Sequence, residues 1–404
     1  MWDLLKLVLI LGLTIYLLTR KWDLGLILLI DAVLIAVLYL YPPLSLLRSI
    51  WLGLTAVDTL KLCGAVFLVL VLAELLRRTE SMLKMVNALQ TLVSDGRVVL
   101  AIIPTVIGMM PMIGGAMFSA PMVNGLGDRL KLSPWRKTFV NYWFRHAMEY
   151  VFPLYQSLLL VAAMLGVSVY TFMGASFPLS LVALVGGVLW GLVGIPRPAR
   201  EVQTTGEQRA AWRDLAVGTW PLLLVILLVV VLELNMLISL GAVCLLLAAV
   251  KRIGPRQWWD VLKRSVPLKT FSAILGVMVF KRVMEDAGAV QAIPAALAAL
   301  GLPNLLVAFL VPFVIGLLTG TPPAAMALGV PVVAPLLDPA RIDLVAGGVW
   351  MFVGCFSGVL LSPLHLCLAL TREYFGAGWG ELYKRIVPAT ALIVAAAGAI
   401  VWLT

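Results

Sequence analysis

Long apolar runs separated by short polar segments dominate the hydrophobic pattern of this chain. An α-helix needs about 20 apolar residues to cross the hydrocarbon core of a bilayer, and ten runs approach that length. They lie at about 4–19, 24–41, 60–76, 139–166, 169–194, 215–233, 236–250, 267–284, 344–370 and 386–403. The pattern therefore predicts an all-α polytopic membrane protein with about ten transmembrane helices.

Two further apolar segments are too interrupted to form straight spans. Residues 98–124 contain Pro104, Pro111 and Pro121 with several glycines, and residues 301–336 have the same character. Proline removes a backbone N–H, and irregular backbone at membrane depth is tolerated only where it is buried in protein or lines a watery cavity. We predict two re-entrant hairpins, although a kinked membrane helix would also fit either segment alone.

The two interrupted segments resemble each other in sequence. The pattern Pro-x-Val-Ile-Gly occurs at 104–108 and again at 312–316, and a Pro-Leu pair follows each copy. Gly108 precedes Pro153 by 45 positions (153 − 108), and Gly316 precedes Pro363 by 47 (363 − 316), so one two-residue insertion explains the difference. Paired segments interrupted by Gly and Pro in two halves of a chain indicate a transporter binding site.

This repeat predicts how the chain is divided. The first repeat covers 1–195, with a broken helix at 139–166, and the second covers 215–404, with a broken helix at 344–370. Each half holds five spans, an odd number, so the second half enters the membrane from the opposite face and the repeats are inverted. A polar linker at 196–214 separates them on the cytoplasmic side.

Composition and charge agree with a membrane protein. The chain is 62% hydrophobic and 12% charged, and no polar stretch is long enough for a soluble catalytic domain. A net charge of +10 would also fit an acidic partner such as nucleic acid. However, most lysines and arginines fall on the loops of one face, as the positive-inside rule predicts for cytoplasmic loops. We therefore expect no nucleic-acid partner, a cell-membrane location and both termini outside the cytoplasm.

Two other segments lie outside the spans. Residues 1–18 have no small-residue cleavage site, so we interpret them as a retained first helix and not as a cleaved signal. Residues 75–90 mix basic and apolar side chains and predict an amphipathic helix on the cytoplasmic surface. That helix is either a solvated extension of its span, which we favour, or an arm that links the two halves.

The tips of the two hairpins are the first candidate site. Short helices after each tip would direct their N-termini at one shared volume and favour an anion there. The alternative is that the small residues only let helices pack closely. The tip residues that offer N–H groups, carbonyls or hydroxyls are Pro111, Gly114, Gly115 and Ser119 in the first hairpin, and Thr319, Gly320 and Thr321 in the second.

The second candidate site is the stretch Arg145-His146-x-x-Glu149, which precedes Pro153. Ionisable residues inside a membrane span are functional candidates by default. Helical spacing makes Arg145 the expected partner of Glu149. Glu149 could carry a proton or a cation, and Arg145 could bind a substrate carboxylate. The alternative is a structural pair that neutralises itself.

The stretches around the two helix breaks are chemically unequal. Tyr155 and Gln156 follow the first break, where Pro153 should free backbone carbonyls. The matching stretch of the second half has neither the acid nor the arginine, and offers only Ser357, Ser362 and His365. We interpret His365 as a packed core residue in preference to a proton relay.

Enzyme and metal chemistry receive little support from the sequence. Ser119 lacks the Gly-x-Ser-x-Gly elbow, and the chain has no His-Glu-x-x-His motif. His146 and Glu149 could reach one metal ion, but no third and fourth ligand is evident. The cysteines lie in apolar stretches without metal-ligand or disulfide spacing, so we interpret them as small buried apolar residues: Cys63, Cys244, Cys355 and Cys367. We expect no metal and no cofactor, apart from Na+ or H+ as a coupling ion.

The motifs at 108–121 and 145–153 resemble an uncharacterised family of prokaryotic integral-membrane proteins. That family looks like a branch of the ion-transporter superfamily, which includes the divalent-anion/sodium symporters and the gluconate and citrate permeases. The resemblance implies inverted repeats, two re-entrant hairpins, two broken helices, a homodimer and an elevator-like movement. The Ser-Asn-Thr tips of the symporters are replaced here by Gly-Gly-Ala-x-x-Ser-Ala-Pro and Thr-Gly-Thr-Pro-Pro.

The sequence thus leads to one functional hypothesis and two alternatives. The hypothesis is a secondary active transporter, embedded in the lipid bilayer, that moves a small organic anion and is driven by H+ or Na+. One alternative is an exporter or antiporter on the same scaffold. The other is an intramembrane enzyme that uses Glu149, His146 and Ser119.

Overall fold

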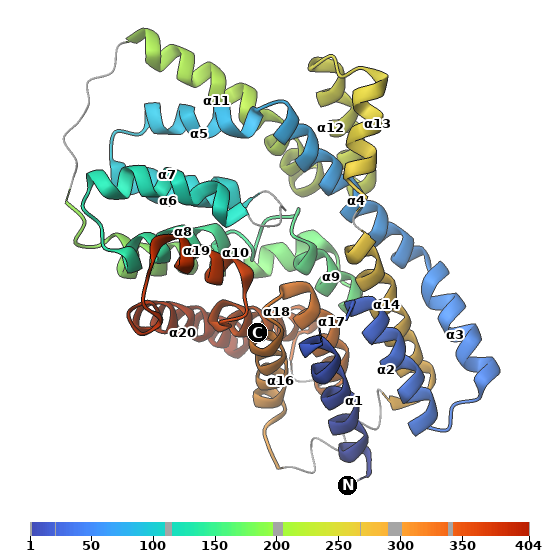
Figure 1. Cartoon of the computed structure of the whole chain (residues 1–404). Coiled ribbons are helices and arrows are strands. Elements are labelled where there is room, and N and C mark those ends of the chain that lie inside the picture. Colours follow the sequence, from blue (N-terminus) through green and yellow to red (C-terminus); the bar gives the residue numbers. More distant parts are fainter. Residues whose placement is uncertain are drawn as a thin grey trace.

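The computed structural model describes residues 2–20, 22–109, 115–196, 205–266, 268–289, 301–337 and 342–403. These residues form helices joined by turns and contain no β-strand, so the all-α fold class is confirmed (Figure 1). Two helices, α10 and α11, end in π-helical turns at Val188–Leu192 and Leu227–Val231, and α17 ends in a 3₁₀ turn at Ala334–Leu336. The helices of the first half are α1 (Trp2–Thr19), α2 (Leu24–Leu38), α3 (Pro43–Thr55), α4 (Val57–Arg78), α5 (Ser81–Leu92), α6 (Gly96–Gly108), α7 (Gly115–Arg129), α8 (Pro134–His146), α9 (Gln156–Leu165) and α10 (Val169–Gly187). Those of the second half are α11 (Thr205–Ile226), α12 (Met236–Val250), α13 (Pro255–Arg264), α14 (Leu268–Asp286), α16 (Asn304–Thr319), α17 (Pro322–Val333), α18 (Leu344–Leu361), α19 (Leu366–Phe375) and α20 (Trp379–Leu403).

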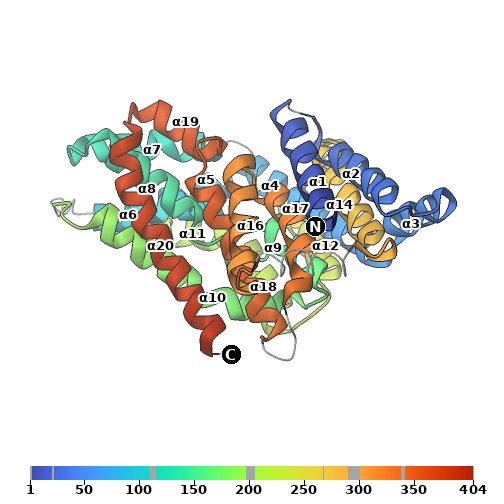
Figure 2. The same ribbon diagram turned by 90° about the horizontal axis from the view of Figure 1, so that it is seen from below.

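The helices pack as two groups, each drawn from both halves of the sequence. The hairpin group consists of α6–α10 and α16–α20, and its helices contact one another across the halves, α7 with α19 and α9 with α17. The flanking group consists of α1–α5 and α11–α14, joined by contacts of α2 and α3 with α14, of α4 with α12 and of α5 with α11. The groups meet where α4 contacts α9 and α14 contacts α17. In Figures 1 and 2, α2, α3 and α14 lie on one side and α6, α7 and α8 on the other, with α16–α18 between them.

Within the described residues, five helical stretches are long and apolar enough to cross a membrane: Val57–Arg78, Val169–Leu192, Gly206–Val231, Leu344–Phe375 and Trp379–Leu403. Each overlaps a predicted span, so the protein is a multi-pass membrane protein. Helices α2, α9 and α12 are apolar but shorter, as are the hairpin helices α6, α16 and α17. The total of ten spans stays a prediction.

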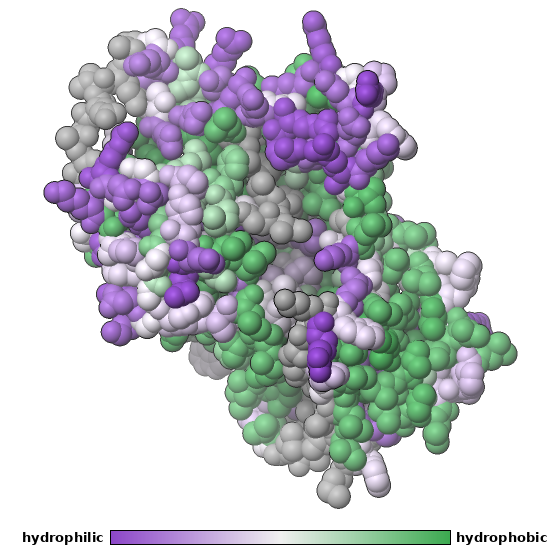
Figure 3. All heavy atoms as spheres, viewed as in Figure 1, coloured by the Kyte–Doolittle hydropathy of each residue, from purple (hydrophilic) through white to green (hydrophobic). Residues whose placement is uncertain are grey.

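The surface supports a bilayer environment. Large apolar side chains are exposed on α2 and α3, among them Val37, Leu44 and Trp51. Such a continuous apolar surface is rare on a soluble monomer. Figure 3 shows hydrophobic residues over α2, α3 and α14, while hydrophilic residues gather at the top, over α11 and α13, and at the left edge. The predicted orientation of the basic face stays a prediction.

Two helices were missed by the sequence analysis. Both α3 and α13 begin with proline at the first helical position, where its missing N–H costs nothing, and both are too short for a span. Helix α3 packs against α14 through Gly53, where a Cβ would lie 3.0 Å from the Cα of Val279. Ser49 of α3 also donates a hydrogen bond to Asp286 of α14 (2.6 Å).

The predicted amphipathic helix at 75–90 is two helices in the structure. Helix α4 ends at Arg78, Glu80 adopts a left-handed conformation (φ 53°), and α5 begins at Ser81. Helix α5 packs against α11, where Gly218 lets its backbone approach, and it buries Met85 and Val86. The favoured interpretation, a solvated extension, was therefore wrong. In the predicted linker, α11 already begins at Thr205, and 197–204 lie outside the described residues.

The order of elements in the hairpin group occurs twice. A helix pair, an interrupted helix and a long helix follow one another in α6–α10 and again in α16–α20. In both series a glycine of the first helix packs against a backbone carbonyl of the third, Gly108 against Arg145 and Gly316 against Cys355. These separations are 37 (145 − 108) and 39 (355 − 316), the same two-residue difference that the sequence repeat shows. The repeat boundaries at 195 and 215 stay predictions.

Candidate functional site

The first hairpin is held against the end of α8. Helix α6 ends at Gly108, and α7 begins at Gly115. Pro111 and Gly114, two of the predicted tip residues, lie between them and outside the described residues. The hydroxyl of Tyr155 donates hydrogen bonds to the carbonyls of Gly108 and Arg145, the latter at 3.4 Å. Tyr155 therefore joins the first hairpin to both sides of the first helix break.

Arg145 lies at the tip of the first hairpin. Its side chain is buried, and Nη1 donates to the carbonyl of Ile107 (3.3 Å) at the end of α6. A Cβ placed on Gly115 would lie 2.5 Å from both Nη1 and Nη2 of Arg145, so the guanidinium rests against the first residue of α7. The guanidinium fits against residue 115 because that residue is a glycine. It places the positive charge of Arg145 beside the N-terminus of α7.

Ser119 of α7 is buried, and its hydroxyl donates back to the carbonyl of Ala116 (3.2 Å). That carbonyl also accepts from the side chain of Asn141 (3.0 Å), which in turn donates to the hydroxyl of Thr371 (3.3 Å). Ser119 thus belongs to a polar contact between α7, α8 and α19. It is not brought to His146, as the enzyme alternative would require.

The first helix break is longer than Pro153 alone predicts. Proline lacks an N–H and clashes with the carbonyl four residues earlier, so Pro153 should kink or break a helix between 149 and 153. The structure responds further upstream: α8 ends at His146, and residues 147–155 form turns. In these turns the carboxylate of Glu149 meets Nδ1 of His146 at 2.6 Å, and both side chains are buried. The expected pairing of Glu149 with Arg145 was therefore wrong, because it assumed a continuous helix.

The second hairpin turns at Thr319, Gly320 and Thr321. Gly320 ends α16 with a left-handed backbone (φ 62°), and Thr321 precedes the paired prolines that begin α17. A Cβ on Gly320 would lie 2.7 Å from the backbone nitrogen of His365. Glycine is required here for both reasons, the positive φ and the close approach of the second break.

The second break, Ser362–His365, is fastened to the second hairpin. The Ser362 hydroxyl donates to the carbonyl of Leu317 (2.6 Å), and Nδ1 of His365 donates to the carbonyl of Gly320 (2.6 Å). Ser357 is buried in α18, and its hydroxyl has no hydrogen-bond partner within the described part of the chain. Among the predicted residues of this half, Ser362, His365 and Gly320 are brought together and Ser357 is not.

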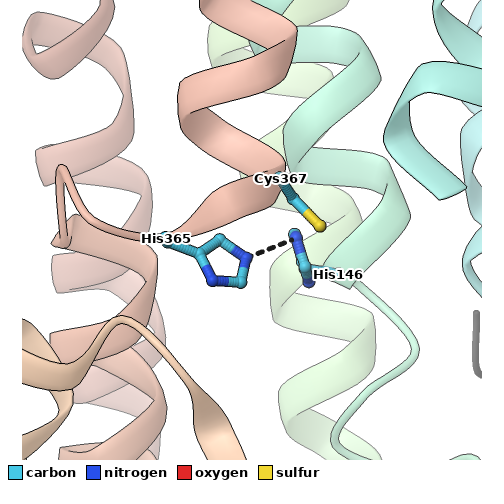
Figure 4. Close-up of side chains that lie close together, drawn as sticks. All are labelled: His146, His365 and Cys367. Carbon is cyan, nitrogen blue, oxygen red and sulfur yellow. Dashed lines mark hydrogen bonds between the residues drawn. The ribbon is translucent and has the colours of Figure 1, made fainter. Parts of the chain in front are cut away.

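The two helix breaks meet at their histidines. Nε2 of His365 lies 3.2 Å from Nε2 of His146, although the residues are 219 positions apart. Cys367, in the first turn of α19, places its sulfur beside them, and the ligand atoms of these three residues all lie within 4.8 Å of one another (Figure 4). Cys367 was interpreted from sequence as one of four small apolar residues. Its position two residues after His365 was the only sequence signal for this cluster.

Aromatic rings enclose the histidine pair. The ring of Tyr142 lies 4.9 Å from that of His146 and 5.8 Å from that of His365, measured between centroids. Phe356 covers His146 from α18 at 6.1 Å. The hydroxyl of Tyr142 donates to the carbonyl of Leu360 (2.9 Å), which fixes this ring against the second break.

Gln156 faces a different space from the histidines. Together with Pro323, near the start of α17, it lines a small, mostly apolar cavity between the two helix groups. The opposite wall is formed by α4 and α14, through residues that include Val66 and Ile274. The N-terminal turns of α9 and α17 therefore border one cavity at the boundary between the hairpin group and the flanking group.

Comparisons with known proteins agree with this architecture. Among solved structures, the fold is similar to that of the YdaH transporter of Alcanivorax borkumensis, with a TM-score of 0.65 and 14% sequence identity over 96% of this chain and 97% of that chain. At this identity the likeness establishes the fold. No curated protein matches the sequence. A family model described as "Protein of unknown function (DUF401)" matches residues 4–404, almost the whole length, so the chain belongs to the DUF401 family.

Proposed function

We propose that this protein is a secondary active transporter of a small organic anion. The observation that carries the proposal is the cavity lined by Gln156 and Pro323, where the N-terminal turns of two interrupted helices meet the flanking group. Transporters with paired broken helices bind their substrates where half-helix ends converge near the bilayer midplane. The fold is also similar to that of a protein described as a transporter.

The preference for an anion follows from the charges at the helix ends. Helices α9 and α17 present their N-termini toward this cavity, and each N-terminus carries about half a positive charge. Free backbone N–H groups at such ends bind carboxylates and phosphates. Helix α17 begins with two prolines, which have no N–H, so most of these groups would come from α9. Arg145 adds a fixed guanidinium beside the N-terminus of α7. No acidic side chain is among the residues lining the cavity.

The division into two helix groups suggests how the anion moves. In an elevator mechanism, one rigid group carries the substrate past another group that stays fixed in the membrane. The hairpin group would be the moving part, since it contains both hairpins and both breaks, and the flanking group would be the fixed part. In this proposal the protein is a homodimer related to the ion-transporter superfamily, is coupled to H+ or Na+, and has both termini outside the cytoplasm.

Anion binding can be tested by a thermal-shift screen of the purified protein against small carboxylates, with and without sodium, at two pH values. A ligand at 100 times its Kd stabilises the folded state by about 2.7 kcal/mol and raises the unfolding midpoint. We expect one carboxylate to raise the midpoint of the wild type. Sodium or pH dependence of that shift would identify the coupling ion.

Gln156→Leu and Gln90→Leu form a matched pair of variants. Gln156 lines the cavity, whereas Gln90 is exposed on α5. The same amide is replaced by the same side chain in both, so only Gln156→Leu should lose the ligand-induced shift. If no carboxylate shifts the midpoint of a folded sample, or if Gln156→Leu shifts as the wild type does, the proposed anion site is wrong.

A further inference from the structure

The cluster of His146, His365 and Cys367 contains three side chains that commonly bind transition metals. They come from different segments: His146 ends α8, His365 lies in the second break, and Cys367 belongs to α19. All three are directed at one point between the two breaks (Figure 4). Both histidines are almost fully buried, with exposed fractions of 4% and 6%.

The hydrogen bonds of the two rings determine which nitrogen atoms face the cluster. A backbone carbonyl can only accept, so Nδ1 of His365 carries its proton toward Gly320. Nδ1 of His146 likewise faces a carboxylate oxygen of Glu149. In a neutral imidazole the other nitrogen, Nε2, then holds a lone pair. With both Nδ1 atoms protonated, two such lone pairs face each other at 3.2 Å, an arrangement that a positive centre shared between them stabilises.

A metal ion satisfies this requirement and also accounts for the sulfur. Two imidazole nitrogens bound tetrahedrally to zinc at 2.0–2.1 Å lie about 3.3 Å apart, close to the distance found here. Histidine ligands almost always donate their second N–H to a carboxylate or a backbone carbonyl, and these are the partners of His146 and His365. A proton shared between the histidines would explain the two nitrogens alone, whereas one metal ion accounts for the nitrogens and the sulfur together.

We propose that His146, His365 and Cys367 form a binding site for Zn2+, a borderline-soft ion that prefers thiolate and imidazole ligands. The charges balance, because the Cys367 thiolate and the Glu149 carboxylate together offset the two positive charges of the ion. The rings of Tyr142 and Phe356 supply the apolar shell that fixes ligand orientation. This site does not depend on the proposed transport function.

Bound Zn2+ would join parts of the fold that are distant in sequence. It links the end of α8 to the second break and to α19, and through His365 it also holds Gly320 at the second hairpin tip. Since the ion binds the folded arrangement of these segments, it should raise the stability of the folded protein by mass action.

Co2+ is a suitable spectroscopic probe of this site. Purified full-length protein in detergent is treated with a chelator, desalted and titrated with Co2+. We expect one equivalent to bind with a thiolate-to-cobalt charge-transfer band in the near ultraviolet and the strong visible absorption of tetrahedral cobalt. Zn2+ should then displace the cobalt and remove both bands.

Cys367→Ser and Cys355→Ser provide a matched test. Cys355 is buried on α18 and lies outside the cluster. The charge-transfer band should persist in Cys355→Ser and disappear in Cys367→Ser, and Zn2+ should raise the unfolding midpoint only in the former. A folded wild-type protein without the band overturns the proposal, as does a band that survives Cys367→Ser. The contact between the histidines would then hold a shared proton.

Discussion

Replacing Gly320 by alanine tests the contact between the second hairpin and the second helix break. Two features of the structure oppose the added methyl group. The backbone of Gly320 is left-handed (φ 62°), and the new Cβ would lie 2.7 Å from the backbone nitrogen of His365. The neighbouring atoms belong to the backbone of Leu364 and His365, so they cannot move aside by a change of rotamer.

The expected cost is the sum of two effects. An L-residue in the left-handed region costs about 1–2 kcal/mol. Displacing His365 also breaks the hydrogen bond from its Nδ1 to the Gly320 carbonyl, with a further loss of about 0.5–1.5 kcal/mol. We therefore expect Gly320→Ala to lower the free energy of unfolding by about 2–3 kcal/mol.

Gly376→Ala is the matched control. Gly376 also ends its helix, α19, with a left-handed backbone (φ 68°), but a Cβ there would meet no atom within 4 Å. Gly376→Ala should therefore lower the free energy of unfolding only by the cost of the left-handed backbone, about 1–2 kcal/mol. Equilibrium unfolding of both variants in mixed micelles of mild detergent and dodecyl sulfate measures the difference. Equal costs for the two variants would refute the close approach of His365 to the hairpin tip.

Three further changes follow from individual contacts. Glu149→Gln removes the carboxylate that contacts His146 and should weaken Co2+ binding by about 10–100-fold in the spectroscopic titration. The thiolate-to-cobalt band should remain. An unchanged affinity for Co2+ would contradict the role given to Glu149. Thr14→Val removes the hydroxyl that donates to the buried carboxylate of Asp31 (2.6 Å) and should lower the free energy of unfolding by about 1–3 kcal/mol in the same assay. The double variant Thr14→Val/Asp31→Leu should recover most of that loss. If it does not, the two side chains do not act as a pair. Trp143→Phe removes the buried indole N–H that donates to the carbonyl of Ala183 (2.7 Å), and should also lower the free energy of unfolding by about 1–3 kcal/mol. A variant as stable as the wild type would argue against this hydrogen bond.

Much of the fold could be predicted from the hydrophobic pattern and the prolines. The apolar runs at 60–76, 169–194 and 215–233 correspond to α4, α10 and α11, because an apolar run of that length has few other stable structures. The short helices α3 and α13 could not be found in this way. Their positions depend on packing, as the contact of Gly53 with α14 shows, and not on their own length or hydrophobicity.

The candidate site was predictable in its parts but not in its pairings. The spacing of Arg145, His146 and Glu149 suggested one helical face with Arg145 as the partner of Glu149. Glu149 instead meets His146, because the helix stops there. The contact between His146 and His365 joins residues 219 positions apart, so no local pattern contains it. Only the internal repeat placed both breaks in equivalent positions, and it did not identify which side chains would meet.

The measurement that tests the central claim most directly is solute flux into proteoliposomes. Purified wild-type protein and Gln156→Leu are reconstituted at equal density, and uptake of the stabilising carboxylate is followed under an imposed proton or sodium gradient. The account predicts accumulation that requires the gradient, stops when the gradient is collapsed and is reduced in Gln156→Leu. Uptake no greater than in protein-free vesicles, under either gradient and in either direction, would contradict it.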